Sequence, residues 1–135
     1  MTRIALLQMT SGIDPAANAR TLVEAVGRAA EGGAAMLFTP EMSGLIDRDR
    51  ARSAGAIATE EEDVVLAGVR QAARDHGLWV HLGSLALRRR DGRLANRGFV
   101  LDDTGAVCAR YDKLHLFDAS TGESLALERS GVAAG

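Results

Sequence analysis

The chain is short of cysteine and of long apolar runs, and each shortage excludes a class of protein. Its single thiol, Cys108, cannot close an internal disulfide, which favours a reducing compartment. No apolar segment approaches the roughly 20 residues of a membrane-spanning helix. The N-terminal segment MTRIALLQMTSGID has a short apolar run and no small-residue cleavage site, so it is interpreted as a first strand and not as a signal peptide. We expect a soluble, cytoplasmic protein of one domain.

An excess of positive charge is also missing. The formal net charge of the 135 residues is −2, whereas nucleic acids and anionic membranes bind concentrated positive charge. The run Arg88-Arg89-Arg90 is followed directly by Asp91 and is interpreted as a solvated hairpin tip. We therefore expect neither a nucleic acid nor a membrane as a partner.

The usual cofactor and hydrolase motifs are absent as well. Three histidines, His76, His81 and His115, are too scattered to indicate a metal site, and there is no Cys-x-x-Cys pair. The glycines form neither a dinucleotide fingerprint nor a phosphate loop, and no Gly-x-Ser-x-Gly elbow indicates a serine hydrolase. No cofactor is expected.

What is present is an alternation of buried strands and helices. Residues 3–9 form a compact apolar run typical of a strand, and Asp14 with Pro15 predicts the start of a helix that ends at Gly32-Gly33. A second strand over 34–38 stops at Thr39-Pro40, because proline cannot continue a central ladder. A long polar loop follows. After it, a second helix is predicted over about 60–76, with acidic residues in its first turn.

The remaining segments predict antiparallel strands. The segment LWVHLGS is a third strand, and a meander of three strands follows it, with turns at 91–92 and 103–105. The order is β-α-β-loop-α-β-β-β-β, which begins as right-handed parallel βαβ units and predicts an α/β fold.

Two charged residues lie where such a sheet binds ligands, beyond the carboxyl ends of strands. Glu41 comes three residues after Phe38, and Lys113 comes two residues after Tyr111. Taken alone, each is better explained as a solvated residue at a strand end than as a functional residue. Cys108 lies in the middle of a predicted strand, where alternation favours a buried structural cysteine and not a nucleophile.

Several segments together resemble the nitrilase superfamily, the carbon–nitrogen hydrolases. They are RIALLQM, LFTPEM, the strand end HLGS and NRGFVLDDTGAVCARYDKLHLFD. The pattern is a Pro-Glu pair after the second strand, an Asn-x-x-x-Val-x-x-x-x-Gly hairpin and then Tyr-x-Lys-x-His-Leu-Phe. The residues that fit this pattern in order are Asn96, Val100, Gly105, Tyr111, Lys113, His115, Leu116 and Phe117.

The resemblance implies a role for each matched residue. Glu41 corresponds to the general base and Lys113 to the catalytic lysine, while Glu128 in LERSGVAAG is the best fit to a further glutamate, with Glu123 as the rival. Amide hydrolysis needs a thiolate nucleophile, a base that creates it and a donor for the oxyanion. The implied fold is the N-terminal half of an αββα sandwich, a mixed parallel/antiparallel sheet with helices on one face.

The family's cysteine nucleophile lies a few tens of residues beyond the lysine, and Cys108 precedes Lys113. Residues 1–135 are therefore expected to be a single partial carbon–nitrogen hydrolase domain that lacks the C-terminal half. One hypothesis is that the chain is a fragment of an amidase, for example one of the ω-amidase type. The complete enzyme is then expected to be a homo-oligomer that acts on a small amide or nitrile. The other is a non-catalytic remnant or assembly module. On either hypothesis the isolated chain is expected to be inactive and to expose apolar surface.

Overall fold

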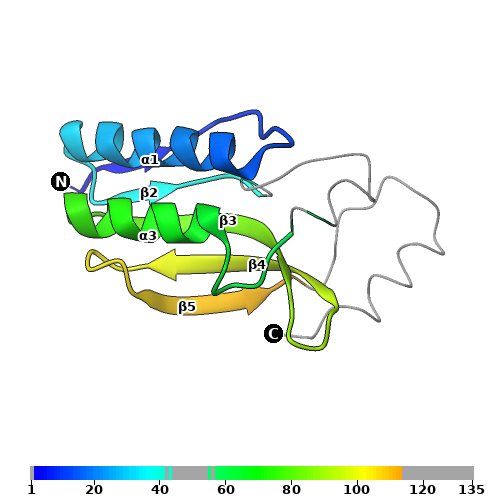
Figure 1. Ribbon diagram of the computed structural model, residues 1–135. Helices are drawn as coiled ribbons and strands as arrows, with labels where there is room; N and C mark the ends of the chain where they lie inside the picture. Colours follow the sequence, from blue (N-terminus) through cyan, green and yellow to red (C-terminus); the bar gives the residue numbers. More distant parts are fainter. Residues whose placement is uncertain (1, 42, 44–54, 56, 114–135) are drawn as a thin grey trace.

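A five-stranded mixed sheet with two helices on one of its faces makes up the described part of the chain (Figure 1). The computed structural model describes residues 2–41, 43, 55 and 57–113. The strands follow one another across the sheet in chain order, with β1, β2 and β3 parallel and β3, β4 and β5 antiparallel. The elements are β1 (Ile4–Leu6), α1 (Pro15–Glu31), β2 (Met36–Phe38), α3 (Val64–His76), β3 (Trp79–Arg88), β4 (Leu94–Leu101) and β5 (Val107–Asp112). The predicted α/β fold with a mixed sheet and helices on one face is confirmed.

The core lies between the two helices and the sheet. Helix α1 contributes Leu22 and Val26, and α3 contributes Val69, all without exposed surface. The sheet contributes Leu82 and Phe99, which are also fully buried. Because side chains alternate across a strand, burial of these positions turns their sequence neighbours to the opposite face of the sheet.

The start of helix α3 differs from the prediction. The sequence predicted a start near Glu60 with acidic residues in the first turn, but the helix begins at Val64 and has none there. Asp63 is its N-cap, and the Asp63 carboxylate accepts a hydrogen bond from the backbone N–H of Leu66 at 2.8 Å. The Glu60 carboxylate instead pairs with two arginines of the sheet, which keeps it outside the helix.

The third strand and the first strand of the predicted meander are one continuous strand, β3. The register between β3 and β4 shifts between Leu82 and Leu85, so that β3 contains one extra residue there. The Gly83-Ser84 pair looks like a strand end in the sequence but is a bulge within the strand. β1 is shorter than predicted because its partner β2 stops at Phe38, before Pro40.

The run Arg88-Arg89-Arg90 leads from β3 into the turn before β4, as the sequence predicts for a hairpin tip. Arg89 forms an ion pair with Asp91 at 3.0 Å within this turn. The acidic residue after the run therefore neutralises part of its charge locally.

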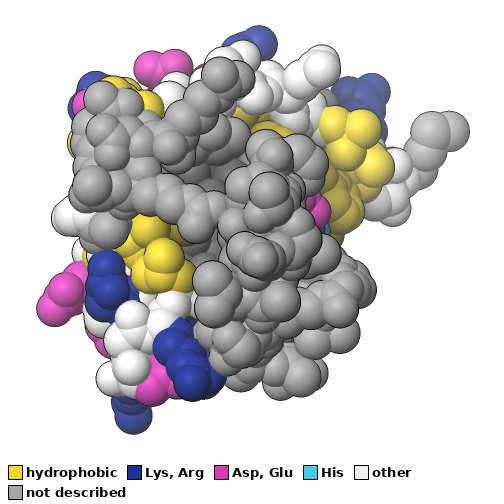
Figure 2. Space-filling model, turned by 90° about the vertical axis from the view of Figure 1, so that its right-hand side faces the viewer, with side chains coloured by type: hydrophobic (Ala, Val, Ile, Leu, Met, Phe, Trp, Pro, Cys, Tyr) yellow, Lys and Arg dark blue, Asp and Glu magenta, His cyan; other side chains and the backbone are white. Residues whose placement is uncertain are grey.

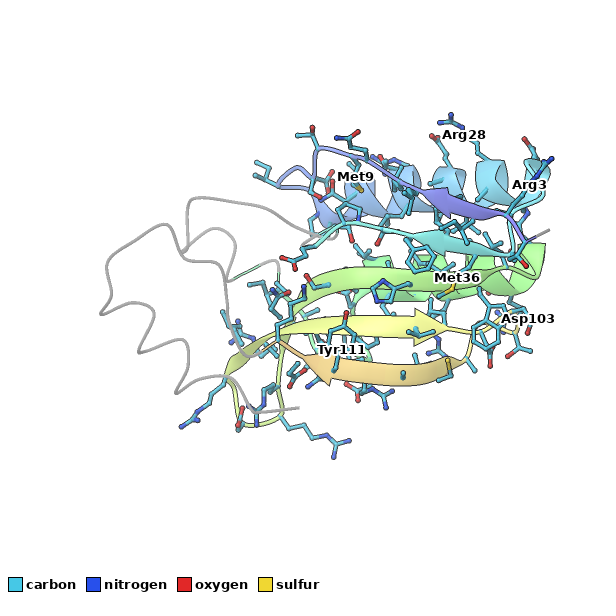
Figure 3. All side chains as sticks on the ribbon, turned by 180° about the vertical axis from the view of Figure 1, so that it is seen from behind. Arg3, Met9, Arg28, Met36, Asp103 and Tyr111 are labelled. Atoms are coloured by element: carbon cyan, nitrogen blue, oxygen red, sulfur yellow. The ribbon has the colours of Figure 1, made fainter. Side chains whose placement is uncertain are left out.

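The face of the sheet that the helices do not cover carries apolar side chains at its surface. Ile4 is 59% exposed, Leu6 77% and Trp79 41%, and each alternates with a residue that packs into the core. Figure 3 views this face and shows Tyr111, 39% exposed, lying across it. The predicted exposure of apolar surface is confirmed for the described residues.

Gly83 is a position where any side chain destabilises the fold. A Cβ atom there would lie 2.5 Å from the carbonyl oxygen of Thr39 and 2.7 Å from the carbonyl carbon of Pro40. Because these are backbone atoms, they cannot move aside as a flexible side chain would. We expect Gly83→Ala to lower the free energy of unfolding by about 1–3 kcal/mol, measured by urea denaturation.

Gly68→Ala on α3 is the matched control, since its Cβ would make an ordinary contact, 3.6 Å from Cγ2 of Val23. Alanine at this helical position is expected to raise stability by about 0.5–1 kcal/mol. Equal unfolding midpoints for the two variants would contradict the close approach of the two backbones at Gly83.

Candidate active site

Glu41 and Lys113 meet at one edge of the sheet. Glu41 lies just beyond β2 and Lys113 just beyond β5, and the Nζ atom of Lys113 donates a hydrogen bond to Oε1 of Glu41 in a salt bridge. β4 runs antiparallel to both β3 and β5, so β5 points the same way as β2. The carboxyl ends of β2 and β5 therefore lie at the same edge. The two residues that the sequence selected separately, 72 positions apart, are in direct contact.

The backbone beside Glu41 is tied to β3. The N–H of Thr39 donates to the carbonyl of His81 at 3.0 Å, and the N–H of Ser43 donates to the carbonyl of Ser84 at 3.2 Å. The buried hydroxyl of Thr39 also accepts from the N–H of Gly83 at 3.2 Å. The turn that carries Glu41 is thus held at both ends, while the Glu41 side chain is 59% exposed.

The backbone of Lys113 is hydrogen-bonded to the neighbouring strand β4. Its N–H donates to the carbonyl of Asn96 at 2.9 Å, which extends the β4–β5 ladder by one residue. The Lys113 side chain is only 21% exposed. The neighbouring Asn96 is buried, and its Oδ1 atom has no hydrogen-bond partner within the described structure.

An aromatic group lies beside this pair. The Tyr111 hydroxyl is 3.3 Å from Nε2 of His81, and the His81 ring centroid is 5.5 Å from that of Phe38. A Cβ at Gly98 would lie 2.7 Å from Cε1 of Tyr111, so the tyrosine ring rests on the bare glycine. The sequence did not predict a role for His81. His81 lies two residues before Gly83 and pairs with Phe38 in the parallel register. Its position in a strand that pairs with the strand before Glu41 could have indicated that it lies near the site.

Cys108 is exposed, and its predicted burial is wrong. β5 is the outermost described strand on its side of the sheet, and neither described helix extends over it (Figure 1). Cys108 donates a hydrogen bond through Sγ to the carbonyl of Val100 at 3.3 Å. Lys113 is five positions further along the chain, which at about 3.3 Å per residue of extended backbone places it roughly 17 Å away. Cys108 is therefore not part of the Glu41–Lys113 site.

Other predicted site residues lie outside the described residues, namely Glu123, Glu128, His115, Leu116 and Phe117. Within the described ranges, no group of three or more histidine, cysteine, aspartate or glutamate side chains is arranged to hold a metal ion. None of the helices in these ranges is both long enough and apolar enough to span a bilayer.

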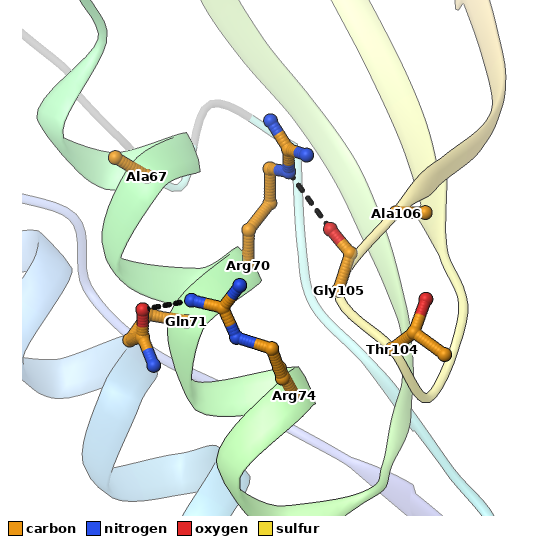
Figure 4. Close-up of a pocket in the computed structure, with 7 residues that line it drawn as sticks. All are labelled: Ala67, Arg70, Gln71, Arg74, Thr104, Gly105 and Ala106. Atoms are coloured by element: carbon orange, nitrogen blue, oxygen red, sulfur yellow. Dashed lines mark hydrogen bonds between the residues drawn. The ribbon is translucent and has the colours of Figure 1, made fainter.

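A hollow of about 350 Å³ lies on the helix side of the sheet, between α3 and the turn before β5 (Figure 4). Arg70 donates through Nε to the carbonyl of Gly105 at 2.8 Å, and Arg74 donates to Oε1 of Gln71. Gly105 precedes β5 and Lys113 follows it, so the hollow lies at the opposite end of that strand from Glu41 and Lys113. It is not a part of the candidate site.

The arrangement at the sheet edge pairs a carboxylate with an ammonium beside a partly apolar surface. A carboxylate accepts a proton from a reacting group, and a fixed ammonium stabilises negative charge that develops on an oxygen. Figure 2 looks toward this edge, and among the described residues in view basic and acidic side chains are interspersed. The contact between Glu41 and Lys113 is the feature of the described residues that bears on the chemistry of this edge.

A carbon–nitrogen hydrolase family model matches residues 3–134. The chain is 33% identical over 132 residues to the Drosophila melanogaster nitrilase and fragile histidine triad fusion protein, covering 98% of this chain and 28% of that protein. It is 35% identical over 119 residues to human deaminated glutathione amidase, covering 85% of this chain and 36% of the relative.

Solved structures show the same similarity. An amidase from Nesterenkonia sp. superimposes with a TM-score of 0.77 at 28% identity, over 99% of this chain and 48% of the amidase. The C. elegans NitFhit protein superimposes with a TM-score of 0.78 at 29% identity, over 100% of this chain and 34% of that protein. Variants of the Nesterenkonia amidase bind acrylamide and butyramide, and one shows acrylamide added at the active site cysteine. The chain spans about half or less of the length of each of these proteins.

Proposed function

This chain belongs to the carbon–nitrogen hydrolase family, and from that premise we propose that it supplies the glutamate and lysine of an amidase site. The proposed reaction is hydrolysis of a non-peptide C–N bond in a small amide. The observation that carries the proposal is the contact between Glu41 and Lys113, which come from distant parts of the chain to one sheet edge. The contact places a carboxylate and an ammonium within reach of one bound substrate at the carboxyl ends of β2 and β5.

In the proposed mechanism Glu41 is the general base. It takes the proton of a cysteine thiol as the sulfur attacks the amide carbon, and it later gives that proton to the departing ammonia. The C–S bond forms, the C–N bond breaks, and water then hydrolyses the thioester to a carboxylate. Lys113 faces the oxyanion of each tetrahedral intermediate, a contribution of several kcal/mol in a water-poor site, on the order of the effect of other oxyanion donors.

Two roles in this proposal fall on residues without a described position. Glu128 is proposed as the further glutamate of the site, and Glu123 is its rival. The nucleophile is proposed to be a cysteine outside residues 1–135, since Cys108 lies at the far end of β5 from Lys113. Residues 1–135 would then be the N-terminal half of a longer hydrolase domain that forms a homo-oligomer, and inactive in isolation.

The proposed substrates are small aliphatic amides and ω-amides. Support comes from relatives named deaminated glutathione amidase and from the Nesterenkonia amidase that binds acrylamide and butyramide. The alternative is a non-catalytic assembly module, which the exposed apolar side chains on the uncovered sheet face favour.

Ammonia release separates the two candidates. We expect the natural polypeptide that contains this chain to release ammonia from aliphatic amides and ω-amides, and to act on the matching nitriles more slowly. Residues 1–135 alone are expected to release none. A natural polypeptide that forms a stable complex and hydrolyses no amide in the panel would favour the assembly module instead.

A further inference from the structure

A group of four charged side chains lies on the other face of the sheet from Lys113. Arg97 on β4 donates to Asp112 on β5 through Nε at 2.5 Å and through Nη2 at 3.1 Å. Arg97 also forms an ion pair with Glu60 at 3.5 Å, and Arg110 donates twice to Glu60, at 3.0 and 3.2 Å. The two arginines and the two carboxylates balance in charge.

The centre of this group is largely withdrawn from water. The Asp112 side chain is 8% exposed and that of Arg97 20%, whereas that of Arg110 is 50% exposed. The hydrogen bond that Arg97 donates to the Asp112 carboxylate is the main cause that raises the pKa of Arg97 above its ordinary value. A two-pronged arginine–carboxylate pair fixes the orientation of both groups, and breaking a buried one leaves an unpaired charge.

The topology connects this pair to Lys113. Arg97 and Asp112 are directly opposite each other in the β4–β5 register, and Lys113 is the next residue along the chain. Because successive side chains point to opposite faces, Asp112 and Lys113 project to opposite sides of the sheet. Strand ends fray when only backbone hydrogen bonds hold them, and β5 lies at the edge of the described sheet. The ion pair therefore links β4 and β5 one residue before Lys113, in addition to the backbone hydrogen bond from Lys113 to Asn96.

We propose that Arg97 and Asp112 are positioning residues for Lys113, with Glu60 holding Arg97 in place. The inference rests on the proposed function for its catalytic meaning. Within the described structure Arg97 and Asp112 form their hydrogen bonds and ion pairs with each other and with Glu60, and not with Glu41 or the Lys113 ammonium, so they act through the strand. The pair keeps the end of β5 in register, which sets the direction of the Lys113 side chain and its distance from Glu41.

The lysine itself reports on this role, because Lys113 is the only lysine in the 135 residues. In the natural polypeptide, labelled with 15N and 13C lysine, its signal is assigned by its loss in Lys113→Arg. We expect Asp112→Asn and Arg97→Lys to shift the NMR resonances of Lys113 toward the chemical shifts of free lysine. The order parameter of the Lys113 backbone amide should fall toward flexible values, below about 0.6 on a scale where a rigid backbone is near 0.85. Both substitutions are close in size to the native residues, and circular dichroism verifies folding.

Arg110→Gln is the matched control. It removes the two hydrogen bonds to Glu60 but leaves the Arg97–Asp112 pair, so the lysine signal is expected to stay in place. In amide turnover, Asp112→Asn should lower kcat about tenfold with KM within twofold, since a misplaced donor affects the transition state.

A folded Asp112→Asn protein with an unchanged lysine signal would overturn the proposal and leave the pair a purely structural contact. The proposed function fails by a different result. If the native sequence hydrolyses no amide but the lysine signal responds to Asp112→Asn, the positioning of Lys113 stands and the amidase assignment does not.

Discussion

Replacing Lys113 by alanine is expected to reduce kcat/KM for amide hydrolysis by about a hundred- to a thousandfold in the natural polypeptide. The ammonium is the donor that faces the oxyanion in the proposed mechanism, and alanine offers no replacement. Because the interaction strengthens only as negative charge develops, the loss should appear in kcat with little change in KM. Steady-state kinetics of ammonia release measures both parameters.

Two further variants test whether the loss in Lys113→Ala comes from the missing ammonium at this position. Lys113→Arg keeps the charge but replaces a compact ammonium with a planar guanidinium, so only partial activity is expected to return. Arg90→Ala removes a positive charge at the hairpin tip after β3 and should leave turnover unchanged. Wild-type kinetics in a folded Lys113→Ala protein would remove Lys113 from the reaction.

Replacing Glu41 by glutamine is expected to lower kcat about a hundred- to ten-thousandfold. Glutamine has the same shape and still offers an oxygen to the Lys113 ammonium, but it is not a base at neutral pH. The proton of the nucleophilic thiol then has no acceptor, so alkylation of that thiol should slow together with ammonia release. Both rates are measurable on one protein preparation.

The loss in Glu41→Gln is expected without a loss of stability. The Glu41 side chain is 59% exposed, and exposed ion pairs contribute about 0–1 kcal/mol. Urea unfolding should therefore give midpoints close to wild type. Glu24→Gln, an exposed position on α1, is the matched control and should change neither rate. Full activity in Glu41→Gln would exclude Glu41 as the base.

The sequence predicted both members of the Glu41–Lys113 pair but not their contact. The predicted order contained a strand break at Gly83-Ser84, and an additional antiparallel strand would have reversed the direction of the last strand. Lys113 would then have been at the opposite edge from Glu41. The structure makes β3 continuous through a bulge, which returns β5 to the direction of β2. A bulge and a strand end share the same small residues, so composition did not distinguish them.

The errors at Cys108 and at the start of α3 have related causes. Alternation within a strand indicates which residues share a face, but it does not show whether that strand lies at the edge of the sheet. Cys108 is exposed because β5 is the outermost described strand on its side. Glu60 was placed in a helix because acidic residues suit a first turn, whereas its actual partners, Arg97 and Arg110, are distant in sequence.

The central claim is that Glu41 and Lys113 act as one catalytic unit, and a double-mutant cycle on kcat/KM tests it most directly. Glu41→Gln, Lys113→Ala and the double variant are compared with wild type in amide hydrolysis by the natural polypeptide. Residues that act together are strongly non-additive, so the double variant is expected to lose about as much as the worse single variant. Losses that multiply, or wild-type turnover in either single variant, would contradict the claim.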